Sequence, residues 1–526
     1  MRMKQNRSGA LALSLLLFSG LCGCTYVPVT ELEVPQQSME PAPGNSRFDA
    51  AAYQADIEAL REIWDQSGQD APVKAQIEEM LRAVDTAYAD YARAEIAYYS
   101  DWNNDERRQT RSAAYEDLYI VSDMTNWALA NGYHRSAYGS LFAPYVTTDD
   151  LDYYLVTTLP HVISDAKADA SDASALLDDY YSAAYDEDTD DAERNLQCAQ
   201  LYLDILNSTS ESDYDYEAFL RDYTPEDAAA VYEELKDTFL PLYEDLSFRV
   251  LDSDAELPEI TDPMAALKTY APRLSARIAE SVERLFDGRL FTVARGDDCY
   301  DGSFTVDLPS EQCALMYLYF YGDFTDLTTA IHEFGHFNSE WRCRTPVLLQ
   351  QNCVDLAEVQ SQGMEVLFTS FYGDLLHEDA KTAEQYALFN LMDAVVSGLC
   401  VGRFEAAVME QADTMEPEDV LALYDRYCAS CGVGLELYEI THLYEQPGYY
   451  VSYGVSALAA LQLYVLLQTQ PEEAIRCYEK LCDCSAISGE YRFRQAMQEC
   501  GMADVFEQGQ VSALSQQLSV RLKELQ

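Results

Sequence analysis

The middle of the chain combines the side chains that a hydrolytic metal site requires. His332 and His336 lie four residues apart in the run HEFGH, and residues four apart share one face of a helix. Both imidazoles can therefore bind one ion, while Glu333 on the adjacent row faces an attacking water as a general base. The chain has only six histidines, so the chance of meeting this spacing at random is about one in a hundred or less.

A carboxylate ligand follows about twenty residues later. Glu358 lies on a second helix, which is predicted to begin near Val354. A structural zinc site is closed by four protein ligands, whereas three ligands leave a position open for chemistry. The pattern therefore predicts one catalytic Zn²⁺ per chain, bound by His332, His336 and Glu358. The alternative is a structural site in which Asp355 supplies the fourth ligand.

Composition limits the partners of the chain. The sequence has 526 residues with 91 acidic and 34 basic side chains, which gives a net charge of -57. Such a charge argues against nucleic acid and against direct contact with an anionic membrane. Hydrophobic residues make up 48% of the sequence, which is enough for two or three globular lobes.

The N-terminus predicts export and a lipid anchor. A basic start with Arg2, Lys4 and Arg7 precedes an apolar stretch at 10–21, which is too short for a membrane-spanning helix. The stretch ends in LCGC, which resembles a bacterial lipobox. We therefore expect a signal peptide at 1–23, lipidation of Cys24 and attachment to a bacterial cell membrane through it. An ordinary signal peptide cut nearby is the alternative.

The segment 25–47 contains four prolines without apolar periodicity, which is typical of a flexible tether. Twelve cysteines follow Cys24, a number that suits an exported protein. Three neighbouring pairs could form disulfides, and free buried thiols are an equally good interpretation. These pairs are Cys299 with Cys313, Cys343 with Cys353, and Cys428 with Cys431.

The rest of the chain divides into segments with different hydrophobic patterns. Residues 48–290 show helical periodicity almost throughout, with a helix start at Thr224 followed by proline and two acids. Between 290 and 326 two strands are predicted, at 302–306 and 314–321, just before the HEFGH helix. Thr325 or Asp326 is expected to cap that helix. Helices return after it, so the fold class is mainly α with a small β-sheet next to the metal-binding helix.

Four segments resemble the thimet oligopeptidase and oligoendopeptidase F family of zinc metallopeptidases. They are the run from Asp326 to His336, the run from Asp355 to Glu365, His442 with the sequence GYYVSYGVS at 448–456, and the C-terminal residues 493–506 together with Tyr478. By motif the resemblance covers residues 290–506. It implies a two-lobed helical metallopeptidase fold with a deep central channel, a helical N-terminal lobe at 48–290 and a catalytic lobe at 291–526.

The resemblance also implies functional roles for individual residues. Glu333 would act as the general base in peptide hydrolysis, and Tyr453 with His442 would stabilise the oxyanion. Substrate-binding residues would be Gly448, Tyr449 and Tyr450. Asp355 and Glu365 lie on the Glu358 side of their helix, which makes them candidate hydrogen-bond partners of the ligand histidines. The alternative for Asp355 is a solvated helix face, and the alternative for His442 is a capped or packed histidine. The expected partners are short peptides, and the membrane is contacted only through the lipid anchor. A non-catalytic peptide-binding lipoprotein is the alternative function.

Overall fold

A computed structural model describes residues 48–146, 151–186, 189–208, 220–251, 257 and 260–526. The predicted signal peptide, the lipidation site Cys24 and the tether at 25–47 lie outside these residues. Helices dominate, as predicted, and a single small sheet interrupts them. The mainly α fold class with a small sheet next to the HEFGH helix is thereby confirmed.

Eleven helices of the described residues precede the sheet. They are α2 (Ala50–Ile63), α3 (Asp70–Tyr99), α4 (Asp105–Arg135), α5 (Gly139–Phe142), α6 (Leu151–Val156), α7 (Leu159–Ala184), α8 (Asp191–Ser208), α9 (Pro225–Glu234), α10 (Leu240–Leu251), α11 (Pro263–Tyr270) and α12 (Ala276–Gly288). The predicted start of α9 is confirmed, because Thr224 and Asp227 form a reciprocal capping box around its first turn.

The remaining elements follow in chain order. They are β1 (Phe291–Ala294), β2 (Phe304–Leu308), β3 (Cys313–Tyr319), α13 (Thr325–Glu340), α14 (Val354–Phe368), α15 (Tyr372–Leu376), α16 (Ala380–Met409), α17 (Pro417–Tyr427), α18 (His442–Glu445), α19 (Val451–Thr469), α20 (Pro471–Asp483), α21 (Phe493–Glu499) and α22 (Gln510–Leu525). Helix α14 begins where the sequence predicted it. Short 3₁₀ turns link many of these helices.

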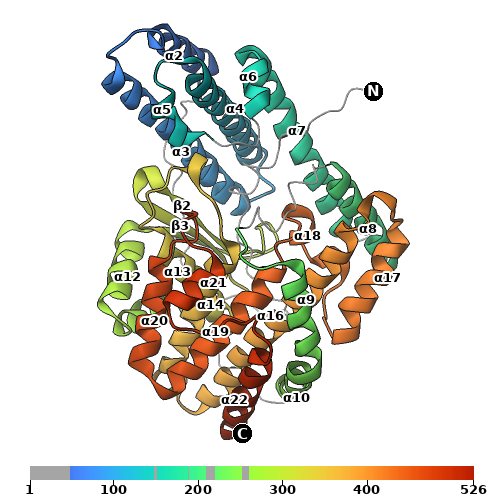
Figure 1. The fold of residues 1–526 in the computed structure, drawn as a ribbon. Helices are drawn as coiled ribbons and strands as arrows, with labels where there is room; N and C mark the ends of the chain where they lie inside the picture. Colours follow the sequence, from blue (N-terminus) through green and yellow to red (C-terminus); the bar gives the residue numbers. More distant parts are fainter. Residues whose placement is uncertain (1–47, 147–150, 187–188, 209–219, 252–256, 258–259) are drawn as a thin grey trace.

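Two hydrophobic cores organise the molecule. The first contains residues of α2 to α6 and of the first half of α7, and the second contains residues of the end of α7 and of helices α8 to α22. Figure 1 shows α2 to α6 gathered at one end, with α7 running from them toward α8 in the larger body. Helices α8 to α12 pack into the same core as α13, so the hydrophobic cores do not divide at residue 290.

The sheet lies between the two cores. Strand β3 is central, pairing in parallel with β1 and antiparallel with β2. Alternate side chains of a strand point to opposite faces, and here each face enters a different core. The first core receives Cys313, Leu315 and Tyr317, whereas the second receives Ala314, Met316 and Leu318. The sheet therefore joins the two hydrophobic cores and is covered on both faces.

The structure corrects two local predictions. Strand β1 was not predicted from the sequence. Its four residues adopt strand geometry because they pair with β3, whereas their own sequence pattern does not indicate a strand. The cap of α13 is also different from the prediction. Asp323 accepts the Thr325 N–H at 2.8 Å, whereas Asp326 accepts the N–H groups of Tyr321 and Gly322 in the preceding turn.

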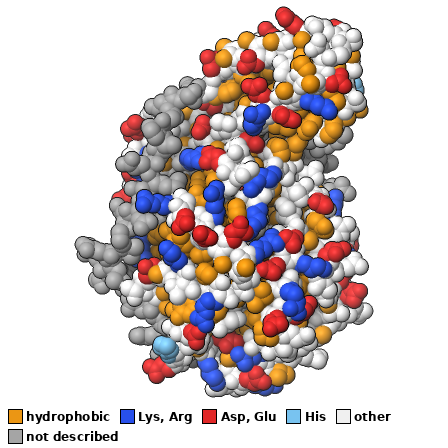
Figure 2. All heavy atoms as spheres, turned by 90° about the vertical axis from the view of Figure 1, so that its left-hand side faces the viewer, with side chains coloured by type: hydrophobic (Ala, Val, Ile, Leu, Met, Phe, Trp, Pro, Cys, Tyr) orange, Lys and Arg blue, Asp and Glu red, His pale blue; other side chains and the backbone are white. Residues whose placement is uncertain are grey.

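All twelve cysteines of the described chain are free thiols, so none of the three suggested pairs forms a disulfide. Two described stretches are apolar enough to cross a membrane, Val354–Met409 and Val451–Thr469. However, 72% and 78% of their most apolar windows are buried inside the molecule. Packing in the second core accounts for their composition. On the face seen in Figure 2, Lys and Arg side chains lie interspersed among Asp and Glu.

Candidate metal and catalytic site

Helix α13 presents His332 and His336 toward its neighbour α14 and Glu333 toward β2. His336 and Glu333 are fully buried, and the His332 side chain is 13% exposed. The two helices approach so closely that a Cβ at Gly335 would lie 2.6 Å from Ser361 Cα and 2.8 Å from the Gln360 carbonyl oxygen. A glycine at this position therefore allows the two helices to face each other across the site.

Helix α14 supplies Glu358 opposite the two histidines. Its Oε2 lies 3.5 Å from His332 Nε2 and 4.0 Å from His336 Nε2. One ligand atom from each of these three residues lies within 4.8 Å of the others, and no other such group occurs in the described chain. Two imidazole nitrogens and one carboxylate oxygen suit Zn²⁺ and related divalent metals. The three predicted ligands thus converge on one point.

Neighbouring side chains orient the candidate ligands. Glu365 lies on α14, and its Oε1 is 2.7 Å from His332 Nδ1. Glu358 accepts a hydrogen bond from Tyr449 Oη at 2.6 Å and another from Ser361 Oγ at 3.1 Å. Burial opposes ionisation of Glu358, but the facing histidines and Tyr449 outweigh it and lower its pKa to about 2. Glu358 is thereby kept as a carboxylate.

Glu333 lies beside the candidate metal ligands, on the side of α13 that faces the sheet. Thr305 of β2 donates a hydrogen bond to its Oε2 at 2.8 Å. Its Oε1 is buried and has no hydrogen-bond partner among the described residues. Burial raises the Glu333 pKa to about 8, although the positive charge of His332 and the Thr305 hydroxyl oppose the shift. One carboxylate oxygen is therefore anchored and the other is left for a proton.

The segment 442–453 brings His442 and Tyr453 together. Tyr453 Oη lies 3.4 Å from His442 Nε2, and both residues are buried. Burial lowers the His442 pKa to about 4, partly opposed by the negative charge of Glu358, so the imidazole is neutral at pH 7. Tyr449 lies near them, with its ring tilted and its centroid 4.7 Å from that of His442. This group contacts the candidate metal ligands through the hydrogen bond from Tyr449 to Glu358.

The remaining predicted site residues lie nearby. Tyr450 is buried, with its ring centroid 5.5 Å from that of Tyr453. Gly448 has φ of +87° and donates its N–H to Glu405 Oε1 at 2.6 Å. Asp355 is buried on α14, where it accepts a hydrogen bond from Tyr223 at 3.1 Å. Its carboxylate also lies 3.5 Å from Arg221 Nε, and it is not a member of the three-ligand group of the described chain.

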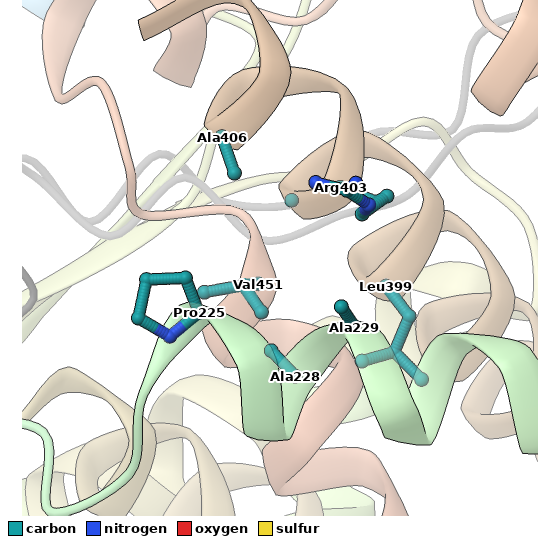
Figure 3. A pocket seen from close by; sticks show the side chains of 8 residues that line it. Pro225, Ala228, Ala229, Leu399, Arg403, Ala406 and Val451 are labelled. Atoms are coloured by element: carbon teal, nitrogen blue, oxygen red, sulfur yellow. The ribbon is translucent and has the colours of Figure 1, made fainter. Parts of the chain in front are cut away.

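Close packing of α16 against α19 fixes the position of Tyr453 near the start of α19. A Cβ at Gly398 would lie 2.2 Å from Gly454 N, and a Cβ at Gly402 would lie 2.5 Å from Val451 Cβ. A small pocket lies beside this contact and is lined by residues of α9 and α16 and by Val451 of α19 (Figure 3). Its lining contains none of the predicted site residues. Helix packing therefore determines the positions of the predicted site residues, and this pocket is separate from them.

Three neighbours of the candidate site were not predicted from the sequence: Thr305, Arg221 and Glu405. Each reaches the site from a segment distant in sequence. Thr305 lies in a predicted strand, but its partner Glu333 is 28 residues away. Arg221 lies 227 residues from Gly448, whose carbonyl it contacts. Only Thr305 carried a local signal, because polar residues on a strand just before the metal-binding helix are candidates for contact with it.

Solved structures share this fold over nearly its whole length. A structure assigned as an oligoendopeptidase F matches with a TM-score of 0.71 at 16% identity, covering 92% of this chain and 98% of that one. A second oligoendopeptidase F assignment, from Bacillus anthracis strain Ames, matches at 0.69 with 15% identity, covering 92% and 98%. PZ peptidase A, solved with an inhibitor, matches at 0.68 with 16% identity, covering 91% and 98%.

No family model matches the sequence, and no curated protein matches it. The similarity to solved structures is therefore one of fold, at identities of 15 to 16%. It extends over both hydrophobic cores and the sheet between them. The chain has the helical fold seen in oligoendopeptidase F structures.

Proposed function

We propose that the chain is a zinc-dependent endopeptidase that hydrolyses peptide bonds in short oligopeptides. The observation that carries this proposal is the convergence of His332, His336 and Glu358 with Glu333 beside them. A pure peptide binder does not require a buried carboxylate next to a metal. The fold shared with oligoendopeptidase F structures supports the same activity.

The donor set fits the proposed metal. His332, His336 and Glu358 would hold one zinc ion, and Glu365 and Tyr449 would keep the ligands oriented through the hydrogen bonds described above. When bound, zinc supplies Lewis acidity that polarises a carbonyl and acidifies water. Three ligands leave room for both, which favours a catalytic site over a closed structural one.

The protein side chains then handle the protons and the developing charge. Glu333 accepts the proton of the attacking water on its unbonded Oε1, while Thr305 holds the other oxygen in place. The same carboxyl group returns the proton to the leaving amine. Tyr453, held against neutral His442, donates a hydrogen bond to the oxyanion as the carbonyl carbon becomes tetrahedral.

Substrate size follows from the proposed position of the site. We infer that a channel between the two lobes gives access to the metal, as the family resemblance implies. Such a channel admits short, unfolded peptides and excludes folded proteins. Gly448, Tyr449 and Tyr450 would line the approach of the substrate backbone, with Tyr449 also contacting Glu358.

We further propose that the enzyme acts outside the cytoplasm on peptides near a bacterial cell membrane. The proposal rests on the signal-like start and the lipobox-like LCGC, with lipidated Cys24 and the proline-containing tether at 25–47 as the attachment. Metabolic labelling with an alkyne fatty acid should modify the parent chain but not a Cys24→Ala variant. Labelling of both would contradict this anchor.

The decisive test is cleavage of a mixed quenched-peptide library by the purified mature protein. Chelation should abolish cutting, zinc should restore it, and an unfolded protein substrate should remain uncut. The thermal midpoint should persist after chelation, because the large cores rather than the metal hold α13 and α14 together. Bound zinc without cutting would support a peptide-binding lipoprotein, and unfolding on chelation would support a structural metal site.

A further inference from the structure

Arg221 lies at the meeting point of three segments that build the site. Its side chain is 0% exposed. Its Nη2 donates one hydrogen bond to the Gly448 carbonyl at 2.8 Å and another to Ser452 Oγ at 2.7 Å. Its Nε lies 3.5 Å from Asp355 Oδ1 on α14. One guanidinium thus connects the loop before α19, the start of α19 and the helix that carries Glu358.

Glu405 of α16 holds the same loop from another direction. It is buried and accepts the Gly448 N–H at 2.6 Å, and it also accepts the backbone N–H of Tyr450. The carbonyl of Gly448 is held by Arg221 while its N–H is held by Glu405. Gly448 itself has φ of +87°, a conformation that glycine adopts without strain. The backbone at this turn is therefore fixed on both of its polar groups.

The fixed turn lies directly before two functional tyrosines. Tyr449 follows Gly448 and donates its hydroxyl to the metal ligand Glu358 at 2.6 Å. Tyr453 follows Ser452, whose hydroxyl accepts from Arg221. A small displacement of the turn would therefore move a partner of the metal ligand and the oxyanion donor together.

We propose that Arg221 is a positioning residue for the hydrolysis proposed above, and that it acts by fixing the 448–452 turn. This inference rests on the proposed function. The guanidinium is suited to the role because its planar donors reach a carbonyl, a hydroxyl and a carboxylate at the same time. A lysine ammonium could keep the charge opposite Asp355 but could not reproduce this set of directions.

The test compares Arg221→Met with the parent enzyme on one quenched peptide. We expect kcat to fall by about 100-fold with little change in KM, because a misplaced oxyanion donor weakens the transition state more than substrate binding. Zinc content should stay at one per chain, since His332, His336 and Glu358 are intact. Arg221→Lys should fold normally and lose part of kcat.

Loss of Arg221 also leaves Asp355 buried without its cationic partner, which can destabilise the protein. The double variant Arg221→Met/Asp355→Asn removes that unpaired charge. We expect it to recover the thermal midpoint of the parent while kcat stays low. Arg521→Met is the matched control, because it breaks the Arg521–Glu384 ion pair of 2.7 Å between α22 and α16, and it should retain full kcat.

The outcomes separate this inference from the proposed function. A parent enzyme that binds zinc but cuts no peptide would contradict the proposed function itself. A parent that cuts, together with a stable double variant of full kcat, would overturn the role of Arg221. Full kcat in Arg221→Lys would equally overturn it, because charge alone would then suffice. A stable, zinc-loaded double variant with low kcat supports the proposal.

Discussion

Glu333 combines one anchored oxygen with one that is left for chemistry. Thr305 binds Oε2 at 2.8 Å, and Oε1 has no hydrogen-bond partner among the described residues. Glu333→Gln keeps the size and the Thr305 contact but cannot accept a proton. We expect kcat/KM for peptide cleavage to fall by at least about 100-fold, since general base catalysis typically contributes 100- to 10,000-fold. Steady-state kinetics on a quenched peptide measures this change.

Zinc content must be measured on the same Glu333→Gln preparation. We expect it to equal that of the parent, because Glu333 does not belong to the three-ligand group. Full cleavage by the zinc-loaded variant would show that another group takes the proton. Thr305→Val is a useful companion, since it removes only the hydroxyl that anchors Glu333 and should give a smaller loss.

Two sources of information predicted the residues that lie together at the candidate site: their spacing along one helix and the resemblance to the family. His332, Glu333 and His336 share one helix, so spacing alone places them together. Glu358 was predicted from a segment that resembles the family, and the structure places it opposite both histidines. Arg221 and Glu405 could not be predicted, because their contacts depend on how distant helices pack.

At the scale of elements, the α13–α14 contact sets the distance between Glu358 and the two histidines that are proposed to bind the metal. A Cβ at Gly335 would meet the backbone of α14 at 2.6 Å from Ser361 Cα, and a backbone atom cannot rotate away. Gly335→Ala should therefore separate the helices and cost about 1 to 3 kcal/mol of stability. Zinc affinity should fall as well, because Glu358 would move away from the histidines. Isothermal titration and thermal unfolding measure both effects.

Gly373→Ala on α15 provides the matched control for Gly335→Ala. A Cβ at Gly373 would have no atom within 4 Å, so the same chemical change meets open space. Zinc affinity and the thermal midpoint should match those of the parent. An unchanged zinc affinity in Gly335→Ala would mean that α13 and α14 can adjust without moving their ligands.

Helices were predicted correctly where the amphipathic pattern was long. Prediction failed for elements and caps whose structure depends on contacts with other segments. The starts of α14 and α9 were predicted from local signals. Strand β1 has only four residues and depends on its partner β3. The cap of α13 was wrongly predicted because Thr325 and Asp326 are both typical capping residues, yet both lie inside the first turn of the helix, and Asp323 accepts the Thr325 N–H.

At the scale of the whole molecule, buried acids lie where the two lobes meet. Asp307 of β2 is 7% exposed and accepts a hydrogen bond from Gln350 at 2.7 Å. Burial raises its pKa to about 7, and nearby Asp85 of α3 is raised to about 6 for the same reason. The folded state thus retains protons that the unfolded chain releases near pH 4.

The sign of the pH dependence follows from this difference in bound protons. A raised folded-state pKa gives stability that is fully present below about pH 4 and is lost as pH rises to about 7. Asp307→Asn removes this loss and retains an oxygen for Gln350. The variant should therefore match the parent at pH 4 and exceed it at pH 8, by about 4 kcal/mol at most. Thermal midpoints measured across this range test the difference, and a constant difference would contradict it.

The division of β3 between two cores bears on how the chain can fold as it is made. The first core is built from α2, α3, α4 and the first half of α7, yet it also needs Phe304, Val306 and Tyr317. More than a hundred residues of the chain, including helices α8 to α12 of the second core, are synthesised between these two contributions. The first lobe therefore leaves the ribosome without the sheet that closes it. The first core is begun before the second, but it can be completed only after β2 and β3 have been synthesised. Its side that packs against the sheet therefore stays exposed until then.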